Sequence, residues 1–350
     1  MISAALSGLR IYMNEHMNKR RGKTRLSSCL AALALAANVL PVSAASAADT
    51  NYPDRAVTII VPFGAGGVAD VLPRIVGEQL TKKWGVPVVV ENKPGASGNI
   101  GMAQAARAKP DGYTLALAPT GNLTTNPTLY RNLPFDTAKD FVPVTLLATS
   151  PNVLVANKDL KVNTIQDLVA YAKAHPGQLN FSSPGAGSGA HLAGELLNQV
   201  TGMEMTHIPY NAMAQAVNDV IAGNVELTFA GISTALPQVK AGKLKPIAVA
   251  TPARIPQLPD LPTVAESGYP GFDVTSWYGI IAPQGVPTEI LDKLQRDIAA
   301  ALEDASVKER FSGLGVVPAA MTRQQFSEFI ASEAKKWNGI IKTAGIEPIQ

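Results

Sequence analysis

Short apolar runs alternate with amphipathic stretches along the chain from residue 56 onward. Uninterrupted apolar runs are typical of buried strands, and apolar positions spaced three and four apart are typical of helices. In the first part of the chain this pattern predicts strands at 56–61, 86–91 and 113–118, with helices at 70–84 and 100–108 between them. A βαβαβ order indicates an α/β fold built on a mostly parallel sheet.

The same alternation restarts further along the chain. Two apolar runs, 142–148 and 152–156, flank Ser150-Pro151 and predict strands that pass from one lobe to a second. The elements expected after them are helices at 164–174, 190–201, 213–222, 287–305 and 323–344, and strands at 179–181, 225–230, 244–250 and 277–282. We expect the last two helices to pack on the first lobe.

Two glycine-rich segments, 62–70 and 183–191, each follow a predicted strand and precede a predicted helix. Glycines let the backbone turn tightly and approach a ligand closely. The free N–H groups and the positive dipole end of the following helix attract negative charge. Two such anion-binding loops predict two lobes around a cleft.

The first 48 residues have the pattern of a secretory signal peptide. A basic region precedes the apolar run 26–42, and Ala45-Ser46-Ala47 offers a cleavage site of small residues. The run is shorter than the roughly 20 residues a membrane span needs, so we expect export to the periplasm with cleavage near Ala47. The sequence leaves open whether translation starts at Met1, Met13 or Met17.

Removal of this segment changes the composition of the mature chain. It takes away Cys29, the only cysteine, which excludes disulfides, thiol catalysis and thiolate metal sites. The chain has 30 basic and 27 acidic residues, of which residues 1–48 hold six and one, so 24 and 26 remain and the net charge is −2. The mature chain has no excess of basic residues, so its charge does not indicate nucleic-acid binding. His175, His191 and His207 are separated and lack clustered carboxylates, so we expect no metal site.

Two enzyme classes compete with a binding protein on local motifs. Residues 64–69 satisfy the G-x-G-x-x-A pattern of an NAD-dependent dehydrogenase, with Glu91 at the end of the next strand. Export argues against a dehydrogenase, because exported compartments normally lack the nicotinamide cofactor. A dehydrogenase would also not explain the second glycine-rich loop at 183–191. Ser188 and His191 suggest a hydrolase, but the glycines of a nucleophile elbow are missing. An interaction module without a ligand is a third alternative, and it predicts a closed or filled cleft.

The order of motifs resembles the receptors of tripartite tricarboxylate transporters, also called Bug proteins. The motifs are PFGAGGVAD at 62–70, ENKPGASGNIG at 91–101, KPDGYTL at 109–115, GAHL at 189–192, HIPY at 207–210, AGKL at 241–244, LPDLPT at 258–263 and WYG at 277–279. The resemblance covers essentially all of residues 52–350.

This resemblance implies a two-lobed periplasmic binding protein of type II that closes on a small organic carboxylate. It implies delivery to an inner-membrane permease or a role in sensing, no chemistry and no cofactor. The first lobe would comprise residues 49–150 and 273–350, and the second residues 151–272. We expect a monomer.

The resemblance also places the ligand-binding loops on this chain. In the first lobe they are Phe63, Ala65, Gly66, Gly67 and Asp70, then Ser97 and Asn99, then Thr120 and Asn122. In the second lobe they are Ser183, Gly187, Ser188 and His191, with Tyr210 and Asn211 closing the site. We expect backbone amides at 65–67, and a helix-capping role for the Asp70 side chain.

These loops contain no arginine, so we expect amides, hydroxyls and waters to hold the carboxylate. Two departures from the family pattern narrow the ligand. Ala230 stands where the family often has aspartate, which removes a partner for a ligand amine, and Asn211 stands where lysine is common. Both favour a mono- or dicarboxylate without an amino group over an amino acid or citrate.

Overall fold

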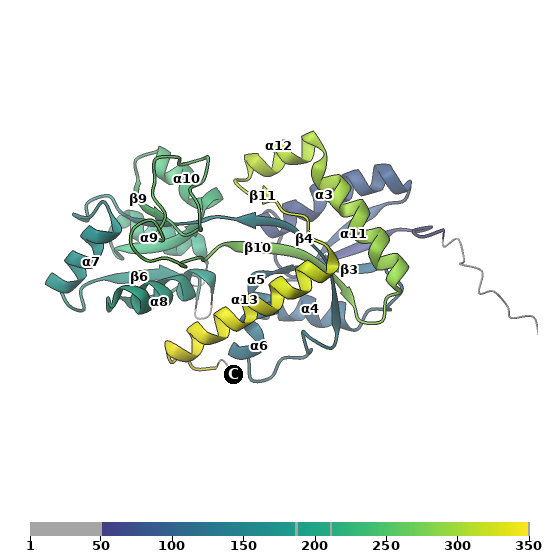
Figure 1. Cartoon of the computed structure of the whole chain (residues 1–350), viewed down its shortest axis with the longest axis horizontal. Helices are drawn as coiled ribbons and strands as arrows, with labels where there is room; N and C mark the ends of the chain where they lie inside the picture. The colour runs from purple at the N-terminus through teal and green to yellow at the C-terminus, as the bar shows by residue number, and fades with distance from the viewer. Residues whose placement is uncertain (1–50, 186–187, 211, 349–350) are drawn as a thin grey trace, which may run out of the picture. The chain divides into compact units, whose positions relative to one another are not determined.

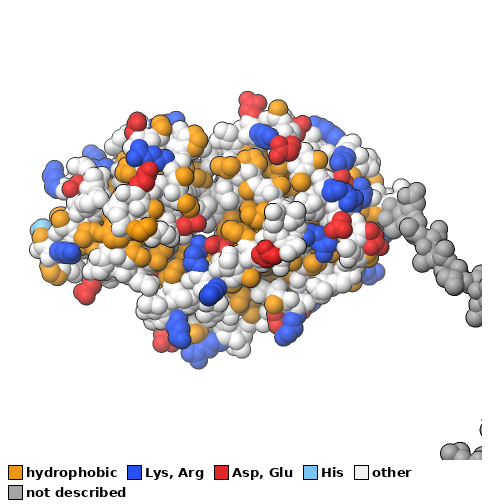
Figure 2. All heavy atoms as spheres, in the orientation of Figure 1, with side chains coloured by type: hydrophobic (Ala, Val, Ile, Leu, Met, Phe, Trp, Pro, Cys, Tyr) orange, Lys and Arg blue, Asp and Glu red, His pale blue; other side chains and the backbone are white. Residues whose placement is uncertain are grey.

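The computed structural model describes residues 51–185, 188–210 and 212–348. The expected signal peptide with its cleavage near Ala47, the alternative start sites and Cys29 lie outside the described residues, as do Gly187 and Asn211. Within the described part of the chain, no helix is long and apolar enough to cross a membrane. On the face in Figure 2, basic and acidic side chains are interspersed, and neither sign forms a broad field.

The first of two sheets is built from both ends of the described chain (Figure 1). Its strand order is β11-β4-β10-β3-β1-β2. The strands are β1 (Val57–Val61), β2 (Val88–Asn92), β3 (Thr114–Pro119), β4 (Phe141–Ser150), β10 (Ser276–Pro283) and β11 (Val317–Pro318). The predicted βαβαβ opening is present, because β1 pairs in parallel with both β2 and β3.

The second sheet is formed by the middle of the chain and has the order β7-β6-β8-β5-β9. Its strands are β5 (Asn152–Asn157), β6 (Asn180–Ser183), β7 (Thr206–Pro209), β8 (Leu227–Gly231) and β9 (Leu244–Val249). Its helices are α7 (Ile165–Ala174), α8 (Gly189–Thr201), α9 (Met213–Ala222) and α10 (Ile232–Lys240).

Both sheets are mixed, whereas the alternation of elements suggested mostly parallel ones. In the first sheet β10 runs antiparallel to β3 and β4, and in the second β5 runs antiparallel to β8 and β9. The reason lies in the chain path between the sheets. Strand β4 continues into β5 after Pro151, and β10 returns beside β4 with Ser276 opposite Ser150.

Helices cover both faces of the first sheet. Successive side chains of a strand point to opposite faces, and Ile59 and Ile60 accordingly belong to different apolar clusters. The cluster around Ile59 includes helices α3 (Val68–Trp84), α11 (Thr288–Glu303) and α12 (Ala305–Gly313). The cluster around Ile60 includes α4 (Asn99–Ala106) and the first half of α13 (Arg323–Thr343). Three short elements, η1 (Ala96–Gly98), α5 (Thr120–Thr124) and α6 (Asn126–Leu129), complete this part of the fold.

Helix α13 does not pack on the first sheet alone, contrary to the expectation from the sequence. Phe326 near its start is buried in the cluster around Ile60. Trp337, Ile340 and Ile341 near its end are buried with Phe181 of the second sheet. A helix of 21 residues is about 30 Å long, which is enough to reach both apolar clusters.

Candidate functional site

Loops from both sheets line a cavity of about 440 Å³. The first sheet contributes Phe63, Ser97, Pro119, Gly121, Asn122, Thr125, Asn126, Leu129 and Tyr130, and the second contributes Pro184, Ser188 and Gly189. Among the described residues that line it, no Asp, Glu, Lys, Arg or His is present. The polar groups of this cleft are therefore backbone amides, hydroxyls and side-chain amides.

Of the helices that the described residues form, α8 begins in the wall of this cavity, at Ser188 and Gly189. Helices α3 and α4 begin at Val68 and Asn99, a few residues after the lining residues Phe63 and Ser97, but their own first residues do not line the cavity. The first N–H groups of a helix have no partner within the helix, and the dipole places positive potential there. The start of α8 therefore gives this uncharged wall a field that favours an anion.

Asp70 supports the first loop from behind. Its carboxylate accepts hydrogen bonds from the Gly66 amide at 2.9 Å, from Asn92 Nδ2 at 2.9 Å and from the Arg74 guanidinium at 2.8 and 2.9 Å. The Arg74 hydrogen bond leads the effects that lower the pKa of Asp70 to about 2. Asp70 is only 4% exposed and does not line the cavity.

The role expected for this loop changes in one respect. The amide of Gly66 is already bonded to Asp70, so it does not point at a ligand. Ala65 and Gly67 flank it in the exposed turn before α3. The expected capping role of the Asp70 side chain is wrong: its carboxylate bonds the Gly66 amide, which precedes the helix, and the N-cap residue Gly67 has no side-chain cap.

The second loop is held in an unusual backbone conformation. Ala96 and Ser97 have φ angles of 46° and 52°, a region that side chains other than glycine adopt at a cost of order 1 kcal/mol each. Ser97 is fixed by three contacts: its hydroxyl accepts from Tyr130 at 2.7 Å, and its carbonyl accepts from Asn122 Nδ2 at 3.0 Å and from Asn126 Nδ2 at 3.3 Å. Asn122 Oδ1 is buried and has no hydrogen-bond partner among the described residues.

Thr120 joins the third loop to the return strand. Its hydroxyl accepts from the Trp277 amide at 2.8 Å, and 3.2 Å separates it from the Trp277 carbonyl. Thr120 thus fixes the end of β3 to β10 and does not line the cavity, whereas its neighbours Pro119 and Gly121 do.

The second glycine-rich loop forms the opposite wall. The Ser188 hydroxyl accepts from the His191 amide at 3.3 Å and caps α8. Ser183 and His191 are buried behind Pro184 and Ser188. The Tyr210 hydroxyl donates to Asp219 of α9 at 2.6 Å, and this bond together with burial raises the pKa of Tyr210 to about 12. Tyr210 is therefore engaged beside the cavity and does not line it.

The segment from Thr125 to Tyr130 also belongs to the site, although the sequence did not predict it there. Thr125, Asn126, Leu129 and Tyr130 all line the cavity. The one local signal was Asn126-Pro127, which is typical of a turn or helix start.

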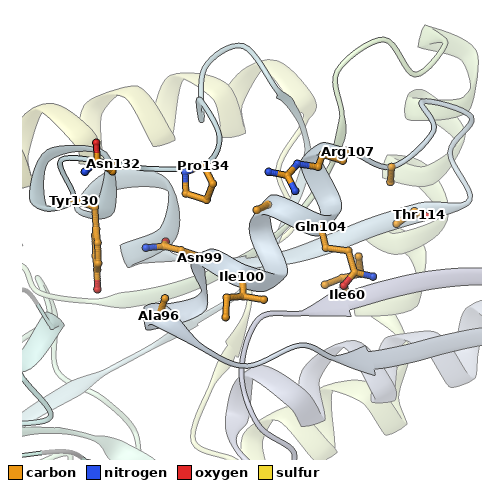
Figure 3. A pocket seen from close by; sticks show the side chains of 12 residues that line it. Ile60, Ala96, Asn99, Ile100, Gln104, Arg107, Thr114, Tyr130, Asn132 and Pro134 are labelled. Carbon is orange, nitrogen blue, oxygen red and sulfur yellow. The ribbon is translucent and has the colours of Figure 1, made fainter. Parts of the chain in front are cut away.

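A larger cavity of about 900 Å³ lies on the other side of the second loop (Figure 3). One side is lined by helix α4 and its C-cap, through Asn99, Ile100, Gln104 and Arg107. The facing side includes Tyr130 and Pro134. Asn99 thus faces this cavity and not the cleft, and its Oδ1 accepts from Asn126 at 2.7 Å. No residue of the second sheet lines it, so we place the candidate site in the smaller cleft.

Two mixed sheets flanked by helices, joined where β4 runs into β5 and where the chain returns to β10, with a cleft between their loops, define a two-lobed periplasmic binding protein. Solved structures agree. The R. palustris protein Rpa4515 with adipate matches with a TM-score of 0.77 and 37% identity, covering 85% of this chain and all of the other. MatC of Rhodopseudomonas palustris with bound malate matches with a TM-score of 0.71 and 31% identity, covering 83% of this chain and 100% of the other.

Residues 72–346 match the family described as "Tripartite tricarboxylate transporter family receptor". BugT of Bordetella pertussis is 36% identical over 305 residues, which are 87% of this chain and 93% of that protein. The chain therefore belongs to the tripartite tricarboxylate transporter receptors, the family that its motifs resemble. This is a class of solute-binding receptors and not a class of enzymes.

The dehydrogenase alternative finds no support in these comparisons. The G-x-G-x-x-A loop is present, but its Gly66 amide is bonded to Asp70, and Glu91 lies 3.3 Å from Lys93 in an ion pair. The antiparallel β10 beside β3 also departs from the parallel order of a dinucleotide-binding sheet.

Proposed function

We propose that this chain is an extracytoplasmic receptor that captures a small organic carboxylate in the cleft and acts without catalysing a reaction. The observation that carries the proposal is the cleft wall itself: helix α8 begins in the wall of a cavity whose described lining has no charged side chain. A carboxylate satisfies the first amides and the dipole of this helix, and it meets no carboxylate that would repel it.

The ligand class follows from the same wall. An ammonium group needs an anionic or carbonyl partner, and the described lining offers no Asp or Glu. Ala230 does not strengthen this point, because it is fully buried in the second sheet and does not face the cavity. Rpa4515 with adipate and MatC with malate support a dicarboxylate without an amino group.

The two lobes would comprise residues 49–150 with 273–350, and residues 151–272. Their relative motion would be a hinge at the two crossings, near Ser150 where β4 runs into β5 and near Ser276 where the chain enters β10. Because the last turns of α13 belong to the first lobe but pack against the second sheet, this hinge motion would shift the contacts of Trp337, Ile340 and Ile341 with that sheet.

The cellular setting is part of the proposal. The chain is exported to the periplasm, the signal peptide is cleaved near Ala47, and a monomer presents its ligand to a permease of the tripartite tricarboxylate type or to a sensor. The family assignment supports the permease as partner.

A thermal-shift screen of the mature chain tests the function. The panel contains adipate, malate, citrate, benzoate, glutamate and NADH. A ligand present at about 100 times its dissociation constant adds about 2.7 kcal/mol of stability and raises the melting temperature by several degrees. We expect shifts with adipate or malate and none with NADH. A shift with NADH alone, or with glutamate above every plain carboxylate, would contradict the proposal.

A further inference from the structure

The hydroxyl of Ser183 lies at the end of β6 between His207 and the turn at Gly185. Its Oγ is 2.6 Å from His207 Nε2 and 2.9 Å from the Gly185 carbonyl oxygen, and it accepts from the Gly185 amide at 3.2 Å. A hydroxyl has a single proton, and the Gly185 carbonyl and His207 Nε2 are both placed to accept it. With the proton on the carbonyl side, the contact to the ring needs His207 Nε2 to carry a proton and donate to Ser183, and we adopt this tautomer.

The surroundings of His207 favour a neutral ring. His191 of α8 stacks on it with the ring centroids 3.8 Å apart, and Phe181 of β6 lies 5.1 Å away. Burial, followed by the proximity of His191, lowers the pKa of His207 to about 4, and Glu195 opposes this shift. On α8, Glu195 Oε1 is 3.5 Å from His191 Nε2.

Among the described residues, the titratable groups that act on the pKa of His207 are His191 and Glu195, both on α8. Strand β6 presents the neutral Phe181 and Ser183. Glu226, before β8, is bonded to Asn180 at the far end of β6, and Glu204 is exposed in the turn before β7. His207 is therefore uncharged at neutral and mildly acidic pH.

The Ser183 network reaches the cleft through Gly185. The carbonyl of Gly185 accepts both the Ser183 hydroxyl and the Ser188 amide, the latter at 3.3 Å. Ser188 caps α8 and, with Pro184 and Gly189, forms the second sheet's wall of the cavity. His207 itself is absent from that wall.

We propose that His207 is a positioning residue of the ligand cleft: its neutral ring fixes the Ser183 hydroxyl, which holds Gly185 and thereby Ser188 at the start of α8. The proposal rests on the function proposed above. In the alternative arrangement, one histidine of the pair is protonated and contacts the anionic ligand directly as a cation. The two arrangements differ in pH dependence, because a cation of ordinary pKa would strengthen binding as pH falls through 6.5.

The test measures the dissociation constants of adipate and malate by calorimetry between pH 7.5 and 6.0. We expect the wild-type affinity to change less than twofold. Ser183→Ala and His207→Phe should each weaken binding about fivefold to tenfold, and the double variant no more than either alone. His207→Gln, whose amide can still donate to Ser183, should bind within about threefold of wild type.

Ser182→Ala is the matched control. Ser182 is its neighbour on β6, equally buried, but its hydroxyl points to the opposite face and donates to Ala216 at 3.1 Å. This variant should lower the melting temperature without changing affinity. An affinity that rises severalfold toward pH 6.0 and loses this rise in His207→Gln, or a Ser183→Ala variant of wild-type affinity, would overturn the proposal.

The tautomer of His207 is a readout that needs no ligand. Nitrogen NMR of histidine-labelled protein should show the proton of His207 on Nε2, and a proton on Nδ1 alone would overturn the proposal. If the wild-type chain binds neither acid, the proposed ligand class fails, and the tautomer still decides the Ser183–His207 contact on which the present inference depends.

Discussion

The indole nitrogen of Trp277 donates a hydrogen bond to the Glu333 carboxylate at 3.1 Å and so joins strand β10 to helix α13. The same oxygen of Glu333 accepts from the Trp337 indole at 3.1 Å, and Lys336 Nζ lies 2.5 Å from the other oxygen. Trp277 is buried in the apolar cluster of the first sheet, and Trp337 in that of the second. Glu333, which is 7% exposed, therefore connects the packing of α13 on both sheets.

We expect Glu333→Ala to destabilise the protein by about 2–4 kcal/mol, because two buried indole N–H groups lose their acceptor. Glu333→Gln keeps one acceptor oxygen and loses the charge, so its cost should be smaller, about 1–2 kcal/mol. Urea unfolding followed by tryptophan fluorescence measures both. An alanine variant within about 0.5 kcal/mol of wild type would show that water replaces the carboxylate at no cost.

The Asp70–Arg74 pair predicts a stability change in acid. The folded pKa of Asp70 is about 2, below its ordinary 3.8, so its contribution is complete above pH 3.8 and is lost as pH falls toward 2. Arg74 is exposed, so solvent screening limits this contribution to about 1–2 kcal/mol. Asp70→Asn should remove the contribution of this pair at pH 7. The free energy of unfolding of the variant should then depend less on pH between pH 4 and 2. An unchanged pH profile in the variant would contradict the assignment.

The sequence predicted best where the signals for a helix or strand are local. Helix α9 has the bounds expected for it, because a strong apolar period ends at Gly223, whose φ of 82° suits a helix C-cap. The helix expected at 287–305 instead ends at Glu303, and a second helix begins at Ala305. Asp304 between them is extended and caps the second helix, a break that apolar period alone does not reveal.

The same difference between local signals and contacts distant in sequence applies to the candidate site. The loops at Phe63 and Ser188 were identifiable because glycines and helix starts lie side by side in sequence. Asn126 and Tyr130 were not, because packing through the short helices α5 and α6 brings them to the cleft. The bond between Asp70 and Gly66 was likewise hidden, since a carboxylate in a first turn can bond to several amides.

Two helix glycines should respond oppositely to alanine. A Cβ at Gly194 of α8 would lie 2.2 Å from the Phe181 ring, whereas a Cβ at Gly339 of α13 would meet nothing within 4 Å. Gly194→Ala should therefore cost about 1–3 kcal/mol through overpacking. Gly339→Ala should stabilise by about 0.5–1 kcal/mol, because alanine is the better helix former. Thermal unfolding of both variants checks this; a Gly194→Ala variant as stable as wild type would mean that α8 can move away from β6.

Gly189 offers the sharpest test of where the ligand carboxylate lies. It is exposed at the first position of α8, lines the cleft and has open space around a Cβ. Gly189→Glu should fold at least as stably as wild type, because an acidic residue suits a helix N-terminus. It should weaken adipate or malate binding by about 100-fold, since like charges about 5 Å apart repel by roughly 3 kcal/mol at an effective dielectric constant of 20.

Gly189→Gln is the control, because it has the same size and no charge. We expect it to weaken binding less than tenfold, so that the difference between the two variants isolates the charge. That difference should shrink as salt is raised, since mobile ions screen a partly exposed pair of charges. Calorimetric titration at low and high salt measures it. Equal affinities for the Glu and Gln variants would place the ligand carboxylate away from α8, on the wall formed by the loops at Phe63 and Ser97.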